Sequence, residues 1–238
     1  MIGFYSIEHI LLIIVLLLSI FDGLYVIRKF ELNEKQTHKV LVILGILLLI
    51  FWILTRLSHI YHSIDEKAVG IVFGETRPYN WFMVLPDSFC STIGLIVPFI
   101  LFLKKYKNSK VMESICCMAL LGLLTNIFYP EYMGRLPFYQ FRTIGAIIYH
   151  TICGFIFLLL LSNKMLRPKV KNWYYTAIAI SLMISLGVIE LVHLNFCEAF
   201  NITKPLVAGL SITSVGFLSL GYIVIDLLFR FTIEKIQK

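Results

Sequence analysis

The chain has 238 residues, of which 59% are hydrophobic and 15% are charged, and its formal net charge is +7. Because a soluble domain carries roughly 25% charged residues, this composition excludes an ordinary soluble protein and predicts one integral membrane domain over residues 1–238. The lysines and arginines lie in short connections, without a basic stripe interleaved with aromatic residues, so the charge does not indicate a nucleic-acid partner.

The apolar segments, taken in chain order, predict seven transmembrane helices. The first contains "ILLIIVLLLSIF" (10–21). We interpret it as a retained span, because Glu8 rather than a basic segment precedes it and no small-residue cleavage site follows. The predicted helices occupy residues 7–27, 40–62, 82–103, 111–128, 142–162, 173–194 and 206–230.

Basic residues are distributed unevenly over the connections between these helices. Fifteen lysines and arginines fall on the side of the first, third and fifth connections and the C-terminal end, against five on the other side. By the positive-inside rule, this bias predicts an external N-terminus and a cytoplasmic C-terminus. The expected fold is therefore an all-α, polytopic bundle of seven transmembrane helices in the cell membrane.

Polar residues at membrane depth fall mainly in the outer half of this bundle, with depth estimated from a rise of about 1.5 Å per residue. Ionisable groups in lipid are costly and usually face a bundle interior or a wet cavity. We therefore expect one polar pocket that opens outward. The residues assigned to it are Arg56, His59, Asp87, Cys90, Asn126, His150, Glu190 and His193.

Other polar groups receive ordinary structural roles. His9, His62 and also His193 are open to a second interpretation, in which they lie among the lipid headgroups, where polar groups cost little. Asp226 can pair with Arg230 one turn further on, as at an ordinary helix end. Three mid-span cysteines are expected to pack as small apolar residues: Cys116, Cys117 and Cys153.

Cys90 and His150 have matching predicted depths, which makes them a candidate nucleophile and base. The thiolate is the reactive form of cysteine, and Arg56 would favour it or bind an anionic substrate group. Two alternatives stay open for Cys90, namely a small packing residue and a disulfide with Cys197. The nearby Pro86 suits the first turn of a helix.

Metal and cofactor signals are weak. Glu190, His193 and Cys197 share a helix face at ligand-like spacing, but a simple polar pair explains them equally well and no metal is assigned. The sequence has no Gly-rich phosphate loop, no G-x-S-x-G and no H-E-x-x-H, so no cofactor is expected. Pro98, inside the third predicted helix, is expected to kink it.

Three segments carry a family resemblance: "LPDSFC" (85–90), "GLLTNIFYPEYMGRLPFYQF" (122–141) and the helix that contains His150. Over roughly residues 80–160 the chain resembles the YwaF-like bacterial integral membrane proteins. That family is similar in turn to a eukaryotic transmembrane acyltransferase that remodels ether phospholipids. The resemblance implies transfer of a fatty acyl group through a cysteine, with assistance from a histidine and with membrane lipids as partners.

Three classes of function remain. In a lipid-acting acyltransferase or hydrolase, His150 is the base, Cys90 the nucleophile and Arg56 the anion anchor. A small-molecule transporter of the three-plus-one-plus-three type would explain Pro86 and Pro205 at corresponding helix entrances, although the apolar cytoplasmic half argues against it. A non-catalytic sensor or assembly factor would usually carry a soluble module as well.

Overall fold

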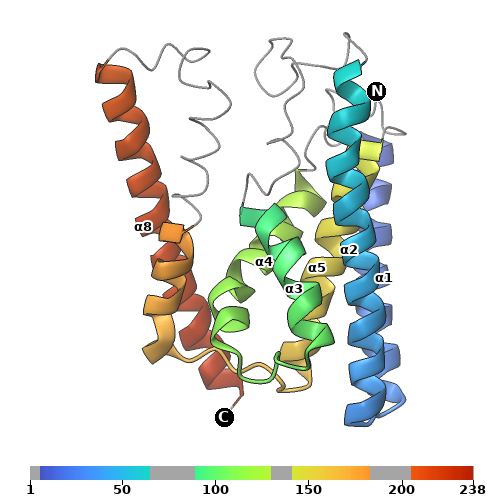
Figure 1. Cartoon of the computed structure of the whole chain (residues 1–238). Coiled ribbons are helices and arrows are strands. Elements are labelled where there is room, and N and C mark those ends of the chain that lie inside the picture. The colour runs from blue at the N-terminus through green and yellow to red at the C-terminus, as the bar shows by residue number, and fades with distance from the viewer. Residues whose placement is uncertain (1–5, 65–88, 130–140, 183–204, 238) are drawn as a thin grey trace.

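The computed structural model describes residues 6–64, 89–129, 141–182 and 205–237 (Figure 1). Within these ranges, side chains are described for residues 6–57, 91–129, 144–182 and 219–237. Every regular element in the described part is a helix, which confirms the predicted all-α class for that part of the chain.

Each of the predicted ranges overlaps a described helix. A 3₁₀ helix, η2 (Val170–Asn172), leads directly into a helix over 173–182. The other helices are α1 (Ile7–Lys29), α2 (Glu34–Ile64), α3 (Phe89–Phe102), α4 (Lys110–Phe128), α5 (Phe141–Ser162) and α8 (Pro205–Ile236).

The start of α2 differs from the prediction. The helix begins at Glu34 rather than at residue 40, because a capping box precedes it. The side-chain oxygen of Asn33 accepts from Gln36 N at 2.9 Å, and the Gln36 side chain accepts from Asn33 N at 2.9 Å. This reciprocal pair satisfies amides that have no partner within the helix, so the helix extends into polar sequence that hydropathy alone excludes.

Among the residues that the structure describes, four helical segments are long and apolar enough to cross a membrane, and a shorter apolar helix covers Ser91–Phe102. The long segments are Ile7–Lys29, Glu34–Leu57, Lys110–Phe128 and Ile144–Ser162. These segments support the prediction that the chain is a membrane protein. The prediction of seven membrane crossings stays a prediction.

The helix α5 lies at the centre of the bundle, where it contacts α1, α2, α3 and α4. The helix α8 stands at one edge against α4 and η2, and α1 and α2 stand at the other edge (Figure 1). Only 6% of the apolar window of α1 is buried. An apolar surface of that extent is typical of contact with lipid.

One core cluster joins α2, α3, α4 and α5, and we call it the central core. Each helix contributes a stripe of residues at spacings of three, four or seven, as expected for one helix face. The buried members include Leu41, Leu48, Ile93, Val97, Leu101, Met112, Ile115, Ala119, Cys153, Ile156, Phe157 and Leu160. Cys116, Cys117 and Cys153 are all buried, as expected for packing residues.

Two contacts fix α3 against its neighbours. The indole Nε1 of Trp52 donates to the carbonyl oxygen of Ser91 at 2.7 Å, which ties α2 to the first turns of α3. A Cβ atom at Gly94 would collide with the ring of Tyr149 on α5. The absence of a side chain at Gly94 therefore leaves room for the end of the Tyr149 ring against α3.

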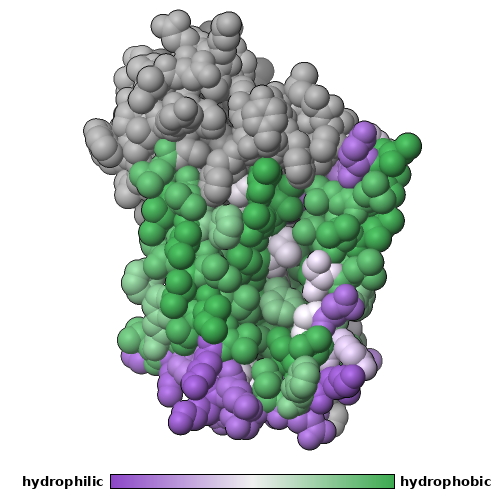
Figure 2. Space-filling view, turned by 90° about the vertical axis from the view of Figure 1, so that its right-hand side faces the viewer, coloured by the Kyte–Doolittle hydropathy of each residue, from purple (hydrophilic) through white to green (hydrophobic). Residues whose placement is uncertain are grey.

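Several connections gather at one end of the bundle (Figure 1). The α1–α2, α3–α4 and α5–η2 connections and the end of α8 all lie there, and these are the segments in which the sequence concentrates basic residues. We call this the basic end and the opposite side the far end. Figure 2 shows a broad apolar band above the hydrophilic basic end. The assignment of the basic end to the cytoplasm stays a prediction.

Candidate functional site

The predicted pocket residues divide into those that the structure describes and those that it does not. The side chains of Arg56, Asn126 and His150 are described. Cys90 lies in the first turn of α3 and His59 lies in α2, but both side chains fall outside the described residues. The whole of Asp87, Glu190, His193 and Cys197 falls outside them, and with these residues the predicted disulfide and metal alternatives.

Arg56 is a buried cation near the far end of α2. Its side chain is 5% exposed, and it shares a helix face with Leu48 and Trp52 at spacings of four. Because Trp52 bonds to Ser91 on α3, Arg56 lies one turn beyond that contact. The guanidinium thus belongs to the bundle interior close to the start of α3, as expected.

Asn126 occupies the corresponding place on α4. It is 4% exposed and continues the stripe that contains Ile115 and Ala119. Neither its amide nitrogen nor its amide oxygen has a hydrogen-bond partner among the described residues. A buried polar group left in this state costs about 1–3 kcal/mol, so packing alone is a poor explanation for an asparagine here.

His9 packs against α4. The imidazole is 0% exposed, and its Nε2 donates to the carbonyl oxygen of Ile127 at 3.4 Å, whereas its level relative to the lipid headgroups stays a prediction. That carbonyl belongs to the last turn of α4, where helix carbonyls lack partners within the helix. His9 therefore closes the end of α4 immediately beside Asn126. The almost uniformly apolar sequence of α1 gave no sign of which face is buried.

His150 lies on the interior face of α5. It shares a stripe with Ala146, Cys153 and Phe157, all of which are buried, and it is itself half-buried. Its ring meets the ring of Tyr149 edge-on, with centroids 5.0 Å apart. The histidine therefore faces the bundle interior.

The contact between Tyr149 and Gly94 sets the level of His150 relative to Cys90. Gly94 lies four residues below residue 90, which is about 6 Å along the axis. Residue 150 is one residue further on than Tyr149, so it lies about 7.5 Å deeper than residue 90, a larger offset than the matched depths predicted. Because side chains on a helix lean toward its N-terminus, the imidazole leans toward the far end and reduces this offset.

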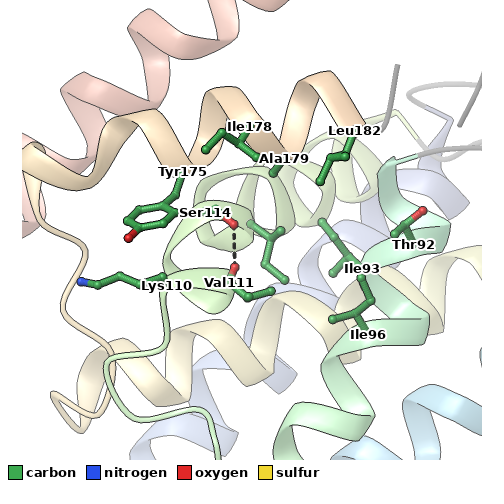
Figure 3. A pocket seen from close by; sticks show the side chains of 11 residues that line it. Thr92, Ile93, Ile96, Lys110, Val111, Ser114, Tyr175, Ile178, Ala179 and Leu182 are labelled. Atoms are coloured by element: carbon green, nitrogen blue, oxygen red, sulfur yellow. Dashed lines mark hydrogen bonds between the residues drawn. The ribbon is translucent and has the colours of Figure 1, made fainter. Parts of the chain in front are cut away.

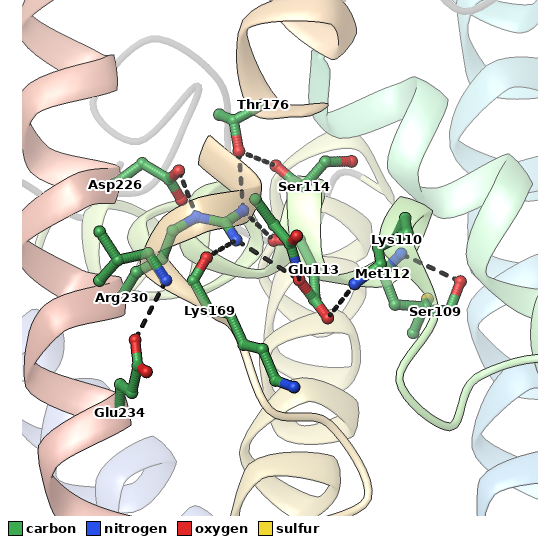
Figure 4. A network of polar contacts seen from close by, with 12 residues as sticks. Ser109, Lys110, Met112, Glu113, Ser114, Lys169, Thr176, Asp226, Arg230 and Glu234 are labelled. Carbon is green, nitrogen blue, oxygen red and sulfur yellow. Dashed lines mark hydrogen bonds and ion pairs between the residues drawn. The ribbon is translucent and has the colours of Figure 1, made fainter. Parts of the chain in front are cut away.

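A second polar cluster lies near the basic end, and sequence analysis missed most of it (Figure 4). Arg230 is 0% exposed, and Glu113 and Asp226 are each 1% exposed. The Nε of Arg230 donates to Oδ2 of Asp226 at 2.7 Å, and a terminal nitrogen lies 3.6 Å from Oε2 of Glu113. The predicted pair is confirmed, but its description as an ordinary helix end is wrong.

The contacts of this cluster join four segments. Arg230 also donates to the carbonyl oxygens of Lys169 at 3.1 Å and Glu113 at 2.9 Å, and to Oγ1 of Thr176 at 2.9 Å. Asn172 donates from Nδ2 to Oε2 of Glu113 at 2.6 Å. The guanidinium is thus occupied by protein oxygens on several sides. We interpret the cluster as a tie that holds α8, η2 and the helix over 173–182 against α4.

The far-end group is the better candidate for a functional site. It combines a buried cation, an amide without a described partner and an interior histidine from three helices. In the cluster around Arg230 the guanidinium is occupied by protein oxygens, and only Oδ1 of Asp226 has no hydrogen-bond partner among the described residues. In comparison with known proteins, a model of the TMEM164 family matches residues 4–203. No curated protein and no solved structure matches the chain. These comparisons do not confirm the YwaF-like resemblance or the similarity to an acyltransferase.

Proposed function

The chain belongs to the TMEM164 family of transmembrane proteins, and on that premise we propose that it acts on membrane lipids, as an acyltransferase or hydrolase whose pocket lies at the far end of the bundle. The proposal places the protein in the cell membrane as a multi-pass protein, with lipids as its partners.

The observation that carries the proposal is the amide of buried Asn126 near the far end of α4, which has no hydrogen-bond partner in the described part of the chain. Buried Arg56 on α2 and interior His150 on α5 are further described polar residues in this half of the bundle. Each residue lies on a helix that contributes a buried stripe to the central core. Residue 90 is seven positions before Val97, so helical spacing assigns it to the matching stripe of α3. The proposed pocket is lined by Arg56, Asn126 and His150 together with Cys90, because polar residues within membrane helices usually face a bundle interior or a wet cavity.

The chemistry assigned to this site is acyl transfer through a thioester. His150 accepts the thiol proton of Cys90, and the thiolate attacks the carbonyl carbon of a lipid ester, so that a C–S bond forms as the ester C–O bond breaks. The leaving alkoxide takes the proton from His150. In the second half, His150 deprotonates a water or a lysolipid hydroxyl, which attacks the thioester and releases Cys90 after reprotonation of the sulfur.

Two further residues have roles in this scheme. The amide N–H of Asn126 donates to the carbonyl oxygen as negative charge develops there. Arg56 binds the phosphate of the lipid, since a guanidinium presents two parallel donors to such an anion. His59, Asp87, Glu190 and His193 stay predicted as substrate contacts nearer the headgroup.

The apolar stripes below the site do not favour a transporter. From Arg56, Asn126 and His150 toward the basic end, the described core continues through residues such as Leu48, Ile115 and Phe157. A transported polar solute needs a polar path from both sides, and the central core between the far-end group and the cluster around Arg230 is apolar.

The test is comparative lipidomics of a strain without the gene and of strains restored with variants. Restoration with wild type should reverse the lipid change, whereas Cys90→Ala and His150→Ala should leave it in place while the proteins accumulate in the membrane. Cys116→Ala is the matched control, because Cys116 is a buried packing residue of the central core, and it should restore the lipids. Restoration by Cys90→Ala or His150→Ala would overturn the proposal.

A further inference from the structure

A groove runs between α3, α4 and the helix over 173–182 (Figure 3). Its volume is about 330 Å³. Most of its lining is apolar and includes Ile93, Ile96, Val111, Ile115, Ile178 and Leu182. Four of these side chains are also exposed at the surface, namely Ile96, Val111, Ile178 and Leu182, so the groove opens onto the apolar band of the molecule.

The two ends of the groove differ in chemistry. The polar tips of Lys110 and Tyr175 point to the same side at one end, and the apolar residues extend from there toward Thr92 and Leu182 (Figure 3). From residue 175 to residue 182 the helix rises about 10 Å. The groove is therefore amphipathic along its length, with an ammonium and a phenol at one end and hydrocarbon beyond them.

The polar end of the groove lies at the level of a membrane interface. Trp173 and Tyr174, which precede Tyr175, are 42% and 44% exposed. Exposed tryptophan and tyrosine residues are enriched where the hydrocarbon of a membrane meets its headgroups. Lys110 begins α4 at the basic end, in agreement with that level.

The charge of Lys110 is available to a ligand. Its Nζ lies 3.4 Å from Oε1 of Glu113, and its side chain is 43% exposed. Glu113 has stronger partners, since Asn172 donates to its other oxygen at 2.6 Å and Arg230 lies 3.6 Å away. If a ligand anion binds Lys110, the buried carboxylate of Glu113 is therefore still compensated by Asn172 and Arg230.

We propose that this groove binds one membrane phospholipid, with an acyl chain along the apolar lining and its phosphate between Lys110 Nζ and the Tyr175 hydroxyl. The occupant is a lipid rather than a protein segment because the groove opens within the apolar band. Lys110, the cation among its described lining residues, lies at the level of the membrane interface. The site is separate from the far-end pocket and does not rest on the proposed function.

Native mass spectrometry of the full-length protein in detergent tests this site. The probe is 1-palmitoyl-2-oleoyl phosphatidylglycerol, titrated against wild type and variants. Lys110→Gln should weaken binding about fivefold, the effect of one lysine near an anionic surface. Ala179→Phe, which fills the groove from the helix over 173–182, should abolish the specific complex. Both variants should keep the elution volume and thermal stability of wild type.

Two controls separate phosphate recognition from general attraction. Lys105→Gln removes the same charge from an exposed position at the same end and should leave binding unchanged. The matching diacylglycerol, which has no phosphate, should bind wild type about fivefold more weakly and should not respond to Lys110→Gln. Equal binding by wild type and Ala179→Phe, or equal losses in Lys110→Gln and Lys105→Gln, would overturn the proposal, and neither result bears on the far-end pocket.

Discussion

Arg230 donates from Nε to Oδ2 of Asp226 across 2.7 Å, and both side chains are buried one turn apart on α8. The pair does not stand alone, because the same guanidinium reaches the backbone and side chain of Glu113 on α4. A buried cation is thereby balanced by two carboxylates from different helices. Removal of one partner from such a group leaves uncompensated charge away from water.

Arg230→Met should therefore destabilise the protein by about 3–5 kcal/mol. The variant leaves Asp226 and Glu113 facing each other without their shared cation. Thermal unfolding in detergent measures the effect. The double variant Arg230→Met with Asp226→Leu should regain part of the loss, because it removes one of the unpaired charges. An Arg230→Met protein as stable as wild type would show that the cluster is not a tie between α8 and α4.

Gly94→Ala should destabilise the bundle by about 1–3 kcal/mol, the usual cost of overpacking. The new Cβ collides with the ring of Tyr149, and neither α3 nor α5 can move without disturbing the central core. Gly221→Ala on α8 is the matched control, since a Cβ there meets nothing within 4 Å, and it should be neutral or stabilising. Unfolding temperatures of the two variants, compared in one detergent, decide the matter, and equal stability would contradict the close contact between Gly94 and Tyr149.

Asn126→Leu should leave stability unchanged or raise it by about 1–3 kcal/mol, because it removes a buried amide that has no partner among the described residues. The same variant should abolish the restoration of lipids in the deletion strain. Stability is read from thermal unfolding and function from lipidomics. A functional Asn126→Leu protein would remove Asn126 from the site, and a strongly destabilised one would show that the amide has a structural partner.

The basic end should face the cytoplasm. A reporter that is active only in the cytoplasm should work when fused after Lys107, in the α3–α4 connection, and should fail when fused after Tyr129, at the far end of α4. The prediction follows from the gathering of the basic connections at one end of the bundle (Figure 1). The reverse pattern of activity would invert the molecule in the membrane and place the far-end pocket inside the cell.

Hydropathy and charge predicted the helical class, the order of the helices and the common end of the basic connections. They could not predict where α2 begins, because Asn33 and Gln36 extend the helix through a local exchange of hydrogen bonds rather than through apolar residues. They also missed Glu113, which looks like an isolated acid at a helix start. Its partners, Asn172 and Arg230, come from distant segments and become visible only when α4, η2 and α8 meet.

The far-end group of Arg56, Asn126 and His150 was predictable from the sequence, but its contacts with other segments were not. Arg56, Asn126 and His150 stand out because polar residues are costly within apolar helices. His9 did not, since a polar residue at the start of a span is equally consistent with the headgroup region, and only its contact with Ile127 shows that it is buried against α4. The depth of His150 relative to Cys90 was misjudged by about one turn, because helix starts alone do not fix how α3 and α5 slide past each other. The contact between Gly94 and Tyr149 fixes how the two helices are placed along each other.

The central claim is that Cys90 receives an acyl group with the help of His150, and intact-protein mass spectrometry tests it most directly. A variant in which the other four cysteines are alanine is incubated with a phospholipid that carries an alkyne-tagged acyl chain. The account predicts a mass increase of one acyl group that neutral hydroxylamine removes and that is absent in Cys90→Ala. In His150→Ala the increase should form about a hundredfold more slowly, the lower end of the usual range for a general base. An identical mass increase in Cys90→Ala, or no acylation in a variant that still restores the lipids of the deletion strain, would contradict the account.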